Sequence, residues 1–325
     1  MKPLSTLLLA CALLAAAPIA NAQDGKKIKR KDALFAKPYA HKKIWKAQKW
    51  SFTKFAIHYK VVATEVAMGG KSNQNVTARS WAMLEGVSEE TMQRITDNFA
   101  DKFKKRMNAE FGIEVEYWND IRDSKNVAKV VEKQDEKVFM HKGRGALLTS
   151  TADKGPWYKR VGGFIPGGKK LAKERGGAAA EMDLIIDFAA FETTINTTKD
   201  YGWQYNTITT NVKQGIVPVL HVTPMQIANT APHAASTVVA MNEVGYMCYF
   251  TLQKPVESTL VYNTDITTHD GEMPSIMKRK FNVMKPNQVA TFVVQADEAK
   301  YEAAANQALD AYLDALVDEI KGVKK

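Results

Sequence analysis

The stretch that decides the fold runs from Ser88 to Tyr117 and reads SEETMQRITDNFADKFKKRMNAEFGIEVEY. Ser88 is a favourable N-cap residue, and Glu89 and Glu90 suit the positive end of a helix. Gly112 supplies a C-terminal stop. Between them, apolar residues recur at steps of three or four, at Met92, Ile95, Phe99, Phe103 and Met107. The stretch therefore predicts one capped amphipathic helix that packs on a core.

A strand is predicted on each side of this helix. Residues 51–67 alternate, with Phe55, Ile57 and Tyr59 on one side, and Ile113, Val115 and Tyr117 alternate directly after Gly112. A strand, a helix and a second strand in this order predict a βαβ unit, in which the two strands lie parallel in one sheet. The break at residues 68–73 predicts a surface loop after the first strand.

The rest of the chain predicts a second helix at 126–137, a long glycine-rich loop at 142–177 and then mainly strands. We expect a strand at 182–195, a hairpin of 203–212 and 216–223 that turns at 213–215, and strands within 237–253, 258–262 and 289–295. Leu309, Leu313, Leu316 and Ile320 predict a closing amphipathic helix at 297–321 that ends at Gly322. The fold class is therefore α/β to α+β, a mixed sheet with a βαβ start, a β-rich second half and a C-terminal amphipathic helix.

The order of these elements resembles a known family. The capped helix up to Gly112, the strand from Ile113 to Tyr117, the run from Met182 to Phe188 and the Ala-rich final helix are similar to the periplasmic α/β domains of the curli-secretion and penicillin-binding-protein activator lipoproteins. The likeness covers residues 51–325 in element order and not in residue identities. It implies a noncatalytic envelope protein that binds other envelope components and can oligomerise, and it transfers no functional residues.

The first 22 residues have the pattern of a cleaved secretory signal. Lys2 is followed by the apolar run 7–17 and by Ala20-Asn21-Ala22. Cys11 loosely matches a lipoprotein box, but cleavage there would leave an apolar stump. We therefore expect a bacterial periplasmic or secreted protein, with peripheral attachment to the outer membrane as an option. Beyond the signal, Cys248 is the single cysteine, and its apolar neighbours predict a buried thiol.

The positive charge of the chain is concentrated near its start. The formal net charge is +10, and residues 23–60 alone hold twelve Lys and Arg against Asp24 and Asp32. Residues 61–325 hold 32 basic and 33 acidic residues, so their net charge is −1. We expect three segments: the signal at 1–22, a basic N-terminal arm at 23–50 and a single body at 51–325.

The arm is the predicted site for an anionic partner, because clustered cations attract polyanions and interleaved aromatic rings can pack on lipid or sugar. The predicted contact residues are Lys26, Lys27, Lys29, Arg30, Lys31, Lys42, Lys43, Trp45, Lys46, Lys49 and Trp50. The expected partners are an envelope protein or an anionic surface polymer or lipid, with a homo-oligomer as a further option. Outside the cytoplasm, nucleic acid is a poor candidate.

Catalytic, cofactor and metal patterns are weak in this sequence. Residues 163–169 fit a phosphate-binding P-loop as far as Lys169, but Lys170 replaces the magnesium-binding hydroxyl and Pro166 removes an amide donor. This segment is therefore a flexible glycine loop, or an anion-contacting loop that uses Lys169, Lys170 and Arg175. Asp183 and Asp187 lie on one side of a predicted strand, and a solvated strand face is the favoured interpretation. We predict no cofactor and no metal site.

The main functional hypothesis is a noncatalytic cell-envelope or secreted binding or assembly protein whose basic arm contacts an anionic surface or partner. The first alternative is a secreted hydrolase with a site near the glycine-rich loop, for example around His221 or His269. The second alternative is a structural subunit of an extracellular assembly, in which the arm exchanges between copies.

Overall fold

The computed structural model describes residues 35, 39–40, 43–69, 76–132, 134–141, 145–159, 165–201, 206–225, 236–268 and 288–324. The predicted signal and most of the basic arm lie outside these ranges, as do predicted sites that involve His269.

The helices and strands follow one another along the chain as a mixed α/β fold. The helices are η2 (Ile44–Lys46), α1 (Glu89–Phe111), α2 (Trp118–Ile121), α3 (Ala128–Val131), η3 (Ala152–Lys154), α4 (Gly168–Arg175) and α6 (Glu298–Lys324). The first strands are β1 (Tyr39–Ala40), β2 (Lys49–Gly69), β3 (Val76–Glu85), β4 (Glu114–Glu116), β5 (Val138–His141), β6 (Gly145–Thr151) and β7 (Ala178–Asp187). The later strands are β8 (Ala190–Tyr201), β9 (Asn206–Val217), β10 (His221–Pro224), β11 (Val238–Asn242), β12 (Met247–Phe250), β13 (Val256–Glu257), β14 (Asn263–Thr268) and β15 (Gln288–Ala296).

Strand β2 is the axis of the larger sheet, whose order is β1-β12-β11-β7-β2-β3-β15-β14. Its first half pairs in parallel with β7, from Trp50 opposite Ala178 to Tyr59 opposite Ile186. Its second half, from Val62 onward, pairs antiparallel with β3. β4 joins the start of β2 in parallel, as predicted for the strands before and after α1, but β3 lies between β2 and α1 in the chain. The mixed sheet predicted from the sequence is confirmed as well.

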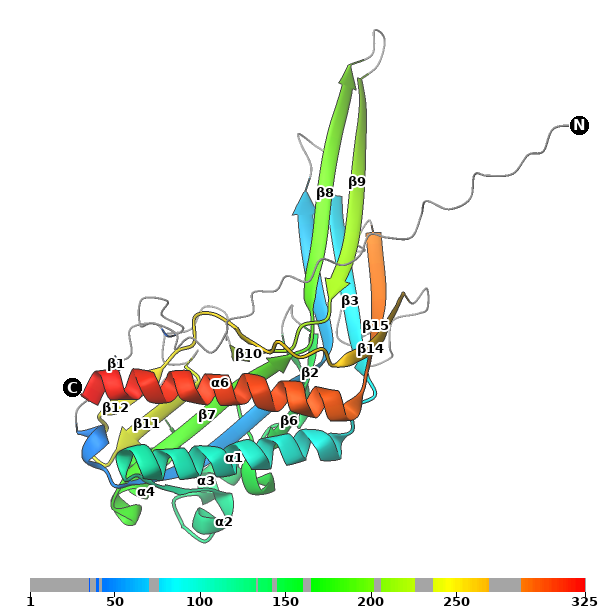
Figure 1. The fold of residues 1–325 in the computed structure, drawn as a ribbon. Coiled ribbons are helices and arrows are strands. Elements are labelled where there is room, and N and C mark those ends of the chain that lie inside the picture. Colours follow the sequence, from blue (N-terminus) through cyan, green and yellow to red (C-terminus); the bar gives the residue numbers. More distant parts are fainter. Residues whose placement is uncertain are drawn as a thin grey trace, which may run out of the picture.

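Helices α1 and α6 lie side by side on one face of the sheet (Figure 1). α1 begins as predicted, because the Ser88 hydroxyl accepts a hydrogen bond from the Thr91 amide at 3.2 Å, and it ends at Gly112, whose φ is 67°. Three ion pairs join the helices with the same offset of 208 residues: Arg94 with Glu302, Lys102 with Asp310 and Arg106 with Asp314. A constant offset means that the two helices run parallel to each other.

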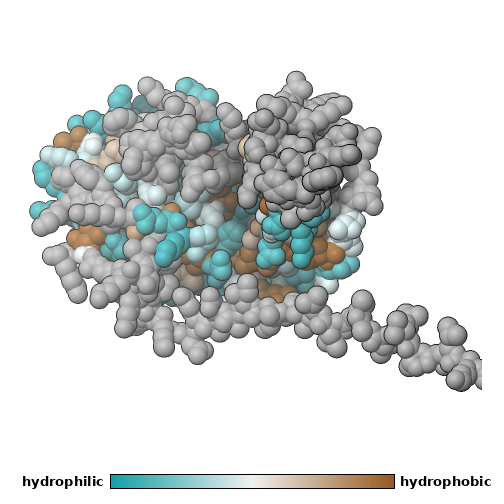
Figure 2. All heavy atoms as spheres, turned by 90° about the horizontal axis from the view of Figure 1, so that it is seen from above, coloured by the Kyte–Doolittle hydropathy of each residue, from teal (hydrophilic) through white to brown (hydrophobic). Residues whose placement is uncertain are grey.

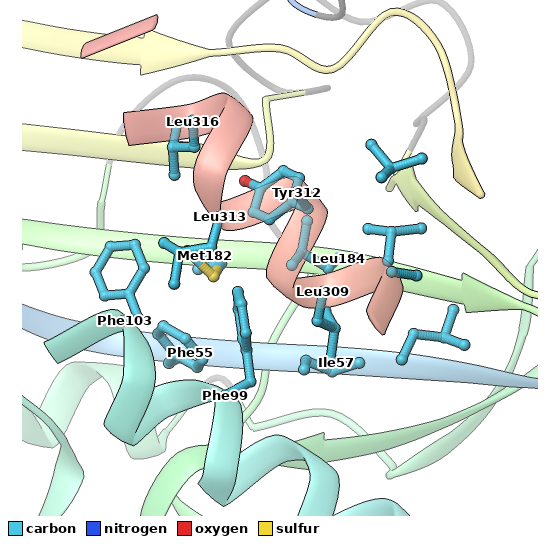
Figure 3. Packing of buried hydrophobic residues seen from close by; sticks show 14 of the residues in the cluster. Phe55, Ile57, Phe99, Phe103, Met182, Leu184, Leu309, Tyr312, Leu313 and Leu316 are labelled. Atoms are coloured by element: carbon cyan, nitrogen blue, oxygen red, sulfur yellow. The ribbon is translucent and has the colours of Figure 1, made fainter. Parts of the chain in front are cut away.

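Apolar side chains from both helices and the central strands form the main core (Figure 3). The Phe99 ring on α1 lies 5.8 Å from the ring of Phe55 on β2 and 6.2 Å from the ring of Tyr312 on α6. Burial of this surface supplies most of the stabilisation, because exposed ion pairs contribute only about 0 to 1 kcal/mol each. The predicted apolar stripe of the last helix, from Leu309 to Ile320, is buried as expected. The helix runs on past the predicted stop at Gly322 to Lys324.

Different elements pack on the two faces of β7. Met182 and Leu184 belong to the core under α1 and α6, whereas Ala179 packs with Leu171 of α4 and with Tyr158. Since neighbouring side chains on a strand point to opposite faces, α4 and Tyr158 lie on the face opposite α1 and α6. All ten residues of β7 are buried.

The glycine-rich region contains regular structure and is not one long loop, which corrects the prediction for 142–177. β6 pairs with β2, and α4 is enclosed by Gly167 and Gly176, both with φ near 70° in the left-handed region. Glycine adopts that conformation readily, so these two glycines bound a short helix instead of marking a flexible segment. Residues 142–144 and 160–164 lie outside the described ranges.

The predicted hairpin is also corrected. β9 continues through 213–215 without a turn and pairs along its whole length with β8, from Ala190 opposite Val217 to Tyr201 opposite Asn206. The predicted strand 182–195 is two strands, β7 and β8, which belong to different sheets. Figure 1 shows that the β8–β9 hairpin and the upper parts of β2 and β3 extend beyond the helices.

Smaller differences concern β3 and α3. Residues 76–85 form a long strand where a loop was predicted, because β3 pairs with both β2 and β15. The predicted helix at 126–137 is reduced to the four residues of α3.

The described surface is mixed in character. Figure 2 shows hydrophilic and hydrophobic residues interspersed on the visible part of it. The most exposed large apolar residues, Met68, Val244 and Val261, belong to separate segments. Within the described ranges, no helix is long and apolar enough to cross a membrane.

Replacing Phe99 tests the shared core. Phe99→Ala should lower the free energy of unfolding by about 3 to 5 kcal/mol, because it leaves a cavity between β2, α1 and α6. Urea denaturation measures this loss. The exposed Asp101→Ala on the same helix is the control and should change stability by less than about 0.5 kcal/mol. A loss for Phe99→Ala as small as that of the control would contradict the packing described here.

Candidate anion-binding site

The last part of the basic arm is packed on the body. Phe35 forms a bridge with Leu252 and is 4% exposed. Tyr39 and Ala40 of β1 pair with β12 at the edge of the sheet. The predicted contact residues Lys26, Lys27, Lys29, Arg30, Lys31 and Lys42 lie outside the described residues. The described arm is therefore anchored at the β12 edge before it enters β2.

The two tryptophans of the arm anchor it and do not form a free contact surface. Trp50 is fully buried, and its ring lies 5.4 Å from that of Trp45. The Trp45 ring in turn lies 6.3 Å from Phe111 and 6.1 Å from Phe250. Trp50 is therefore removed from the predicted partner-binding set, because an outside ligand cannot reach it in this structure.

Lys49 is held by carboxylates of β4. Its ammonium lies 3.3 Å from Glu114 and 3.2 Å from Glu116, and the hydrogen bond with Glu116 raises the pKa of Lys49. Burial alone would raise the pKa of Glu116, but hydrogen bonds from Arg175, Ser51 and Lys49 outweigh it and lower the pKa. Lys49 and Arg175 thus stabilise the join between β2, β4 and α4. Lys43 and Lys46 are the exposed arm cations in the described part.

A cavity of about 430 Å³ lies beside the start of α4. Its described lining holds three lysines, Lys125, Lys169 and Lys170, and no carboxylate. The other lining residues are Asn126, Ile165, Gly167, Gly168 and Met241. The sequence singled out Lys169 and Lys170 as anion-contacting residues, and the structure brings them together with Lys125. Arg175, the third residue of that prediction, does not line the cavity and is paired with Glu116 instead.

Two glycines let α4 approach the cavity wall closely. A Cβ on Gly167 would lie 2.5 Å from the carbonyl oxygen of Asn126, and a Cβ on Gly168 would lie 2.9 Å from the Cβ of Ile165. Larger residues would push α4 away from this wall. The glycines thus set the position of the next two residues, Lys169 and Lys170.

The turn between β11 and β12 joins the cavity to the arm. The Asn242 side chain accepts hydrogen bonds from the amides of Val244, Gly245 and Tyr246 at 3.1, 3.0 and 2.9 Å, which fixes the turn. A Cβ on Gly245 would lie 2.4 Å from the Cε of Lys169, so the Lys169 side chain extends across this glycine. Tyr246 follows Gly245 in the turn, and the Lys43 ammonium of the arm lies 4.7 Å from the centre of its ring.

Cations from distant parts of the sequence therefore gather at one end of the sheet. η2, α4 and the carboxyl end of α6 all lie at the left of Figure 1. The nearby carboxylate of Glu174 accepts hydrogen bonds from Ser124 at 2.6 Å and Asn126 at 2.5 Å, and it is not part of the described cavity lining.

A second polar cluster lies on the same face of β7 but is buried. Lys54 lies 2.7 Å from Asp183, and His58 lies 3.2 Å from Asp183 and 2.9 Å from Thr149. Tyr158 hydrogen-bonds to Glu181. The predicted solvated face of Asp183 and Asp187 is therefore wrong, because these residues are only 3% and 7% exposed. Asp187 pairs with Lys60. Both carboxylates do lie on one side of β7, as predicted.

The hydrolase alternative rested on His221 and the glycine-rich region. His221 on β10 lies 3.8 Å from Asp187, but Asp187 also pairs with Lys60. His58 and Asp183 are buried under Trp157 and Tyr158, so this cluster is not open to a substrate. Burial raises the pKa of the Cys248 thiol to about 12, which keeps it protonated at neutral pH. The described groups thus favour structural roles.

Comparisons with protein-family models, curated proteins and solved structures found no match. The resemblance to the envelope lipoprotein domains stays a prediction.

The buried histidine predicts a pH dependence of stability. Burial lowers the pKa of His58 below 6.5, although the neighbouring Asp183 opposes this shift. The unfolded chain then binds a proton that the folded chain does not, so stability falls as the pH drops below about 6.5. This contribution approaches about 1.4 kcal/mol per pH unit. Urea denaturation of wild type and His58→Gln between pH 7.5 and pH 5.5 (roughly one unit to either side of the free histidine) measures it. Equal slopes in both proteins would contradict the assignment.

Proposed function

We propose that the protein is a noncatalytic binding or assembly protein of the cell envelope, whose basic N-terminal arm attaches it to an anionic surface or partner. The observation that carries the proposal is the placement of arm and cavity around one turn. Lys43 of the arm lies over Tyr246, and Lys169 of the cavity extends across Gly245. In the sequence, residues 23–34, with Lys26, Lys27, Lys29, Arg30 and Lys31 against Asp24 and Asp32, directly precede Phe35, which bridges Leu252.

Electrostatics supports this arrangement. Each basic residue close to an anionic membrane surface contributes about 1 kcal/mol, which is about a fivefold change in the binding constant. Several cations are therefore needed for stable attachment, and salt screens them within a Debye length of roughly 10 Å. The arm supplies these cations on a segment separate from the neutral body. The envelope location itself is supported by the signal pattern at 1–22.

The anchored part of the arm gives the charged part a defined origin. Phe35 bridges Leu252, and Tyr39 and Ala40 pair with β12, so the chain that follows residues 23–34 is held at the β12 edge. Lys43 and Lys46 of the arm and Lys169 and Lys170 of the cavity are further exposed cations on the body. This combination favours a partner with many negative charges.

Neutralising part of the arm tests the proposal. In the chain that begins at Gln23, the triple variant Lys29→Gln, Arg30→Gln and Lys31→Gln should bind vesicles rich in phosphatidylglycerol on the order of a hundredfold more weakly at low salt. Co-sedimentation with these vesicles measures binding, and neutral vesicles give the background. High salt should remove most of the wild-type binding.

A charge-matched control separates the arm from total charge. Lys105, Lys137 and Lys300 are exposed on the body, and changing all three to Gln removes the same charge. This control should retain most of the binding. Equal binding by the arm variant and the wild type, or an equal loss in arm variant and control, would rule out an arm-specific contact.

A further inference from the structure

We infer that the cavity beside α4 is a binding site for a phosphate monoester, with the phosphate at the lysines and the organic group on the apolar wall. This inference rests on the proposed function only for the source of the ligand, since an anionic envelope surface can supply phosphorylated headgroups. The cavity itself stands on its own geometry. Its volume of about 430 Å³ lies in the range of small-molecule sites, roughly 300 to 1,000 Å³.

The charge of the lining selects an anion. Lys125, Lys169 and Lys170 come from two segments that are more than 40 residues apart in sequence, and no described lining residue is acidic. Each ammonium carries three donors and no acceptor, so the three together offer a dense set of donors to one anionic group.

Phosphate monoester chemistry fits this lining better than a carboxylate. A monoester phosphate carries about −1.5 to −2 charges near neutral pH and three strong acceptor oxygens. Lysine binds phosphate well as a point charge from different directions, whereas bidentate recognition of a planar carboxylate favours arginine. The cations of the described lining are all lysines, and Arg175 is paired with Glu116 instead.

The fold makes room for one of these lysines, Lys169, beside the β11–β12 turn. Lys169 extends across Gly245, and a Cβ there would collide with its Cε and Nζ, at 2.4 and 2.8 Å. The absence of a side chain at position 245 thus makes room for Lys169 beside the turn.

The cavity lining also contains apolar residues. Ile165 and Met241 line the cavity and are 4% and 1% exposed. Gly167 and Gly168 add backbone without side chains to the wall. An apolar surface next to a cationic one suits a ligand with both characters, which is why the inferred ligand is an ester and not inorganic phosphate alone.

Calorimetric titration with phenyl phosphate tests the site in the chain that begins at Gln23. We expect saturable binding that is tighter than binding of inorganic phosphate. Lys169→Gln should weaken it by about tenfold or more, because a charge-assisted hydrogen bond is lost. The control Lys173→Gln removes an exposed lysine of the same helix that does not line the cavity, and it should bind as the wild type does.

Several outcomes would overturn the inference. These are the absence of saturable binding, an equal effect of the two substitutions, or equal affinity for inorganic phosphate and phenyl phosphate. Circular dichroism and urea denaturation of both variants show whether a loss reflects unfolding.

Vesicle competition identifies the source of the phosphate. Vesicles with phosphatidic acid, a monoester, that displace phenyl phosphate better than phosphatidylglycerol vesicles assign a lipid-borne headgroup. Displacement by soluble phosphate esters alone assigns a soluble ligand, and either result supports the ligand class. The triple arm variant should keep its affinity for phenyl phosphate. Failure of the arm proposal and failure of the cavity inference are thus separate results.

Discussion

The parallel pairing of β2 with β7 is the constraint on which the rest of the structure depends. A strand that is buried on both faces cannot stand alone, and β7 is buried at every position. α1 and α6 cover one face, while α4 and the segment around Tyr158 cover the other. The buried charges follow from this arrangement, because Glu181 and Asp183 lie on the second face and need Lys54, His58 and Tyr158 as partners.

Periodicity in the sequence predicted the elements that have a single apolar side. α1 with its cap at Ser88, the parallel pairing of β2 with β4 and the apolar stripe of α6 all follow from such spacing, and the structure confirms them. The mixed α/β class follows from the same elements. These parts were predictable because one face of each element is apolar and the other is polar.

The second face of the sheet was not predictable in the same way. Asp183 and Asp187 read as solvated because charged side chains are rarely buried without partners, and those partners are distant in sequence. The helix that covers this face could not be predicted either. The glycines that precede and follow α4 cannot be told apart in sequence from the glycines of a flexible loop. The hairpin of β8 and β9 was misplaced because Gly215 was taken as a turn, whereas the backbone there continues as a strand.

The candidate site was half predictable. Lys169 and Lys170 were singled out from their setting, but Lys125 and Met241 carry no local signal that would join them to a cavity. The same holds for the β11–β12 turn, which lies about 200 residues from Lys43 in sequence. The net positive charge of the chain belongs to residues 23–60, whereas the cavity lysines lie on a body whose net charge is −1.

The parallel arrangement of α1 and α6 has a consequence for how the chain folds. Each of their three matched ion pairs closes a loop of 208 residues, and the core beneath needs Leu309 and Tyr312 as much as Phe99. Contacts between residues so far apart in sequence form slowly, because the chain must first lose the conformational entropy of the loop and gains the stabilising contacts only afterwards. A chain still being synthesised cannot complete this core until residues 298–324 are made.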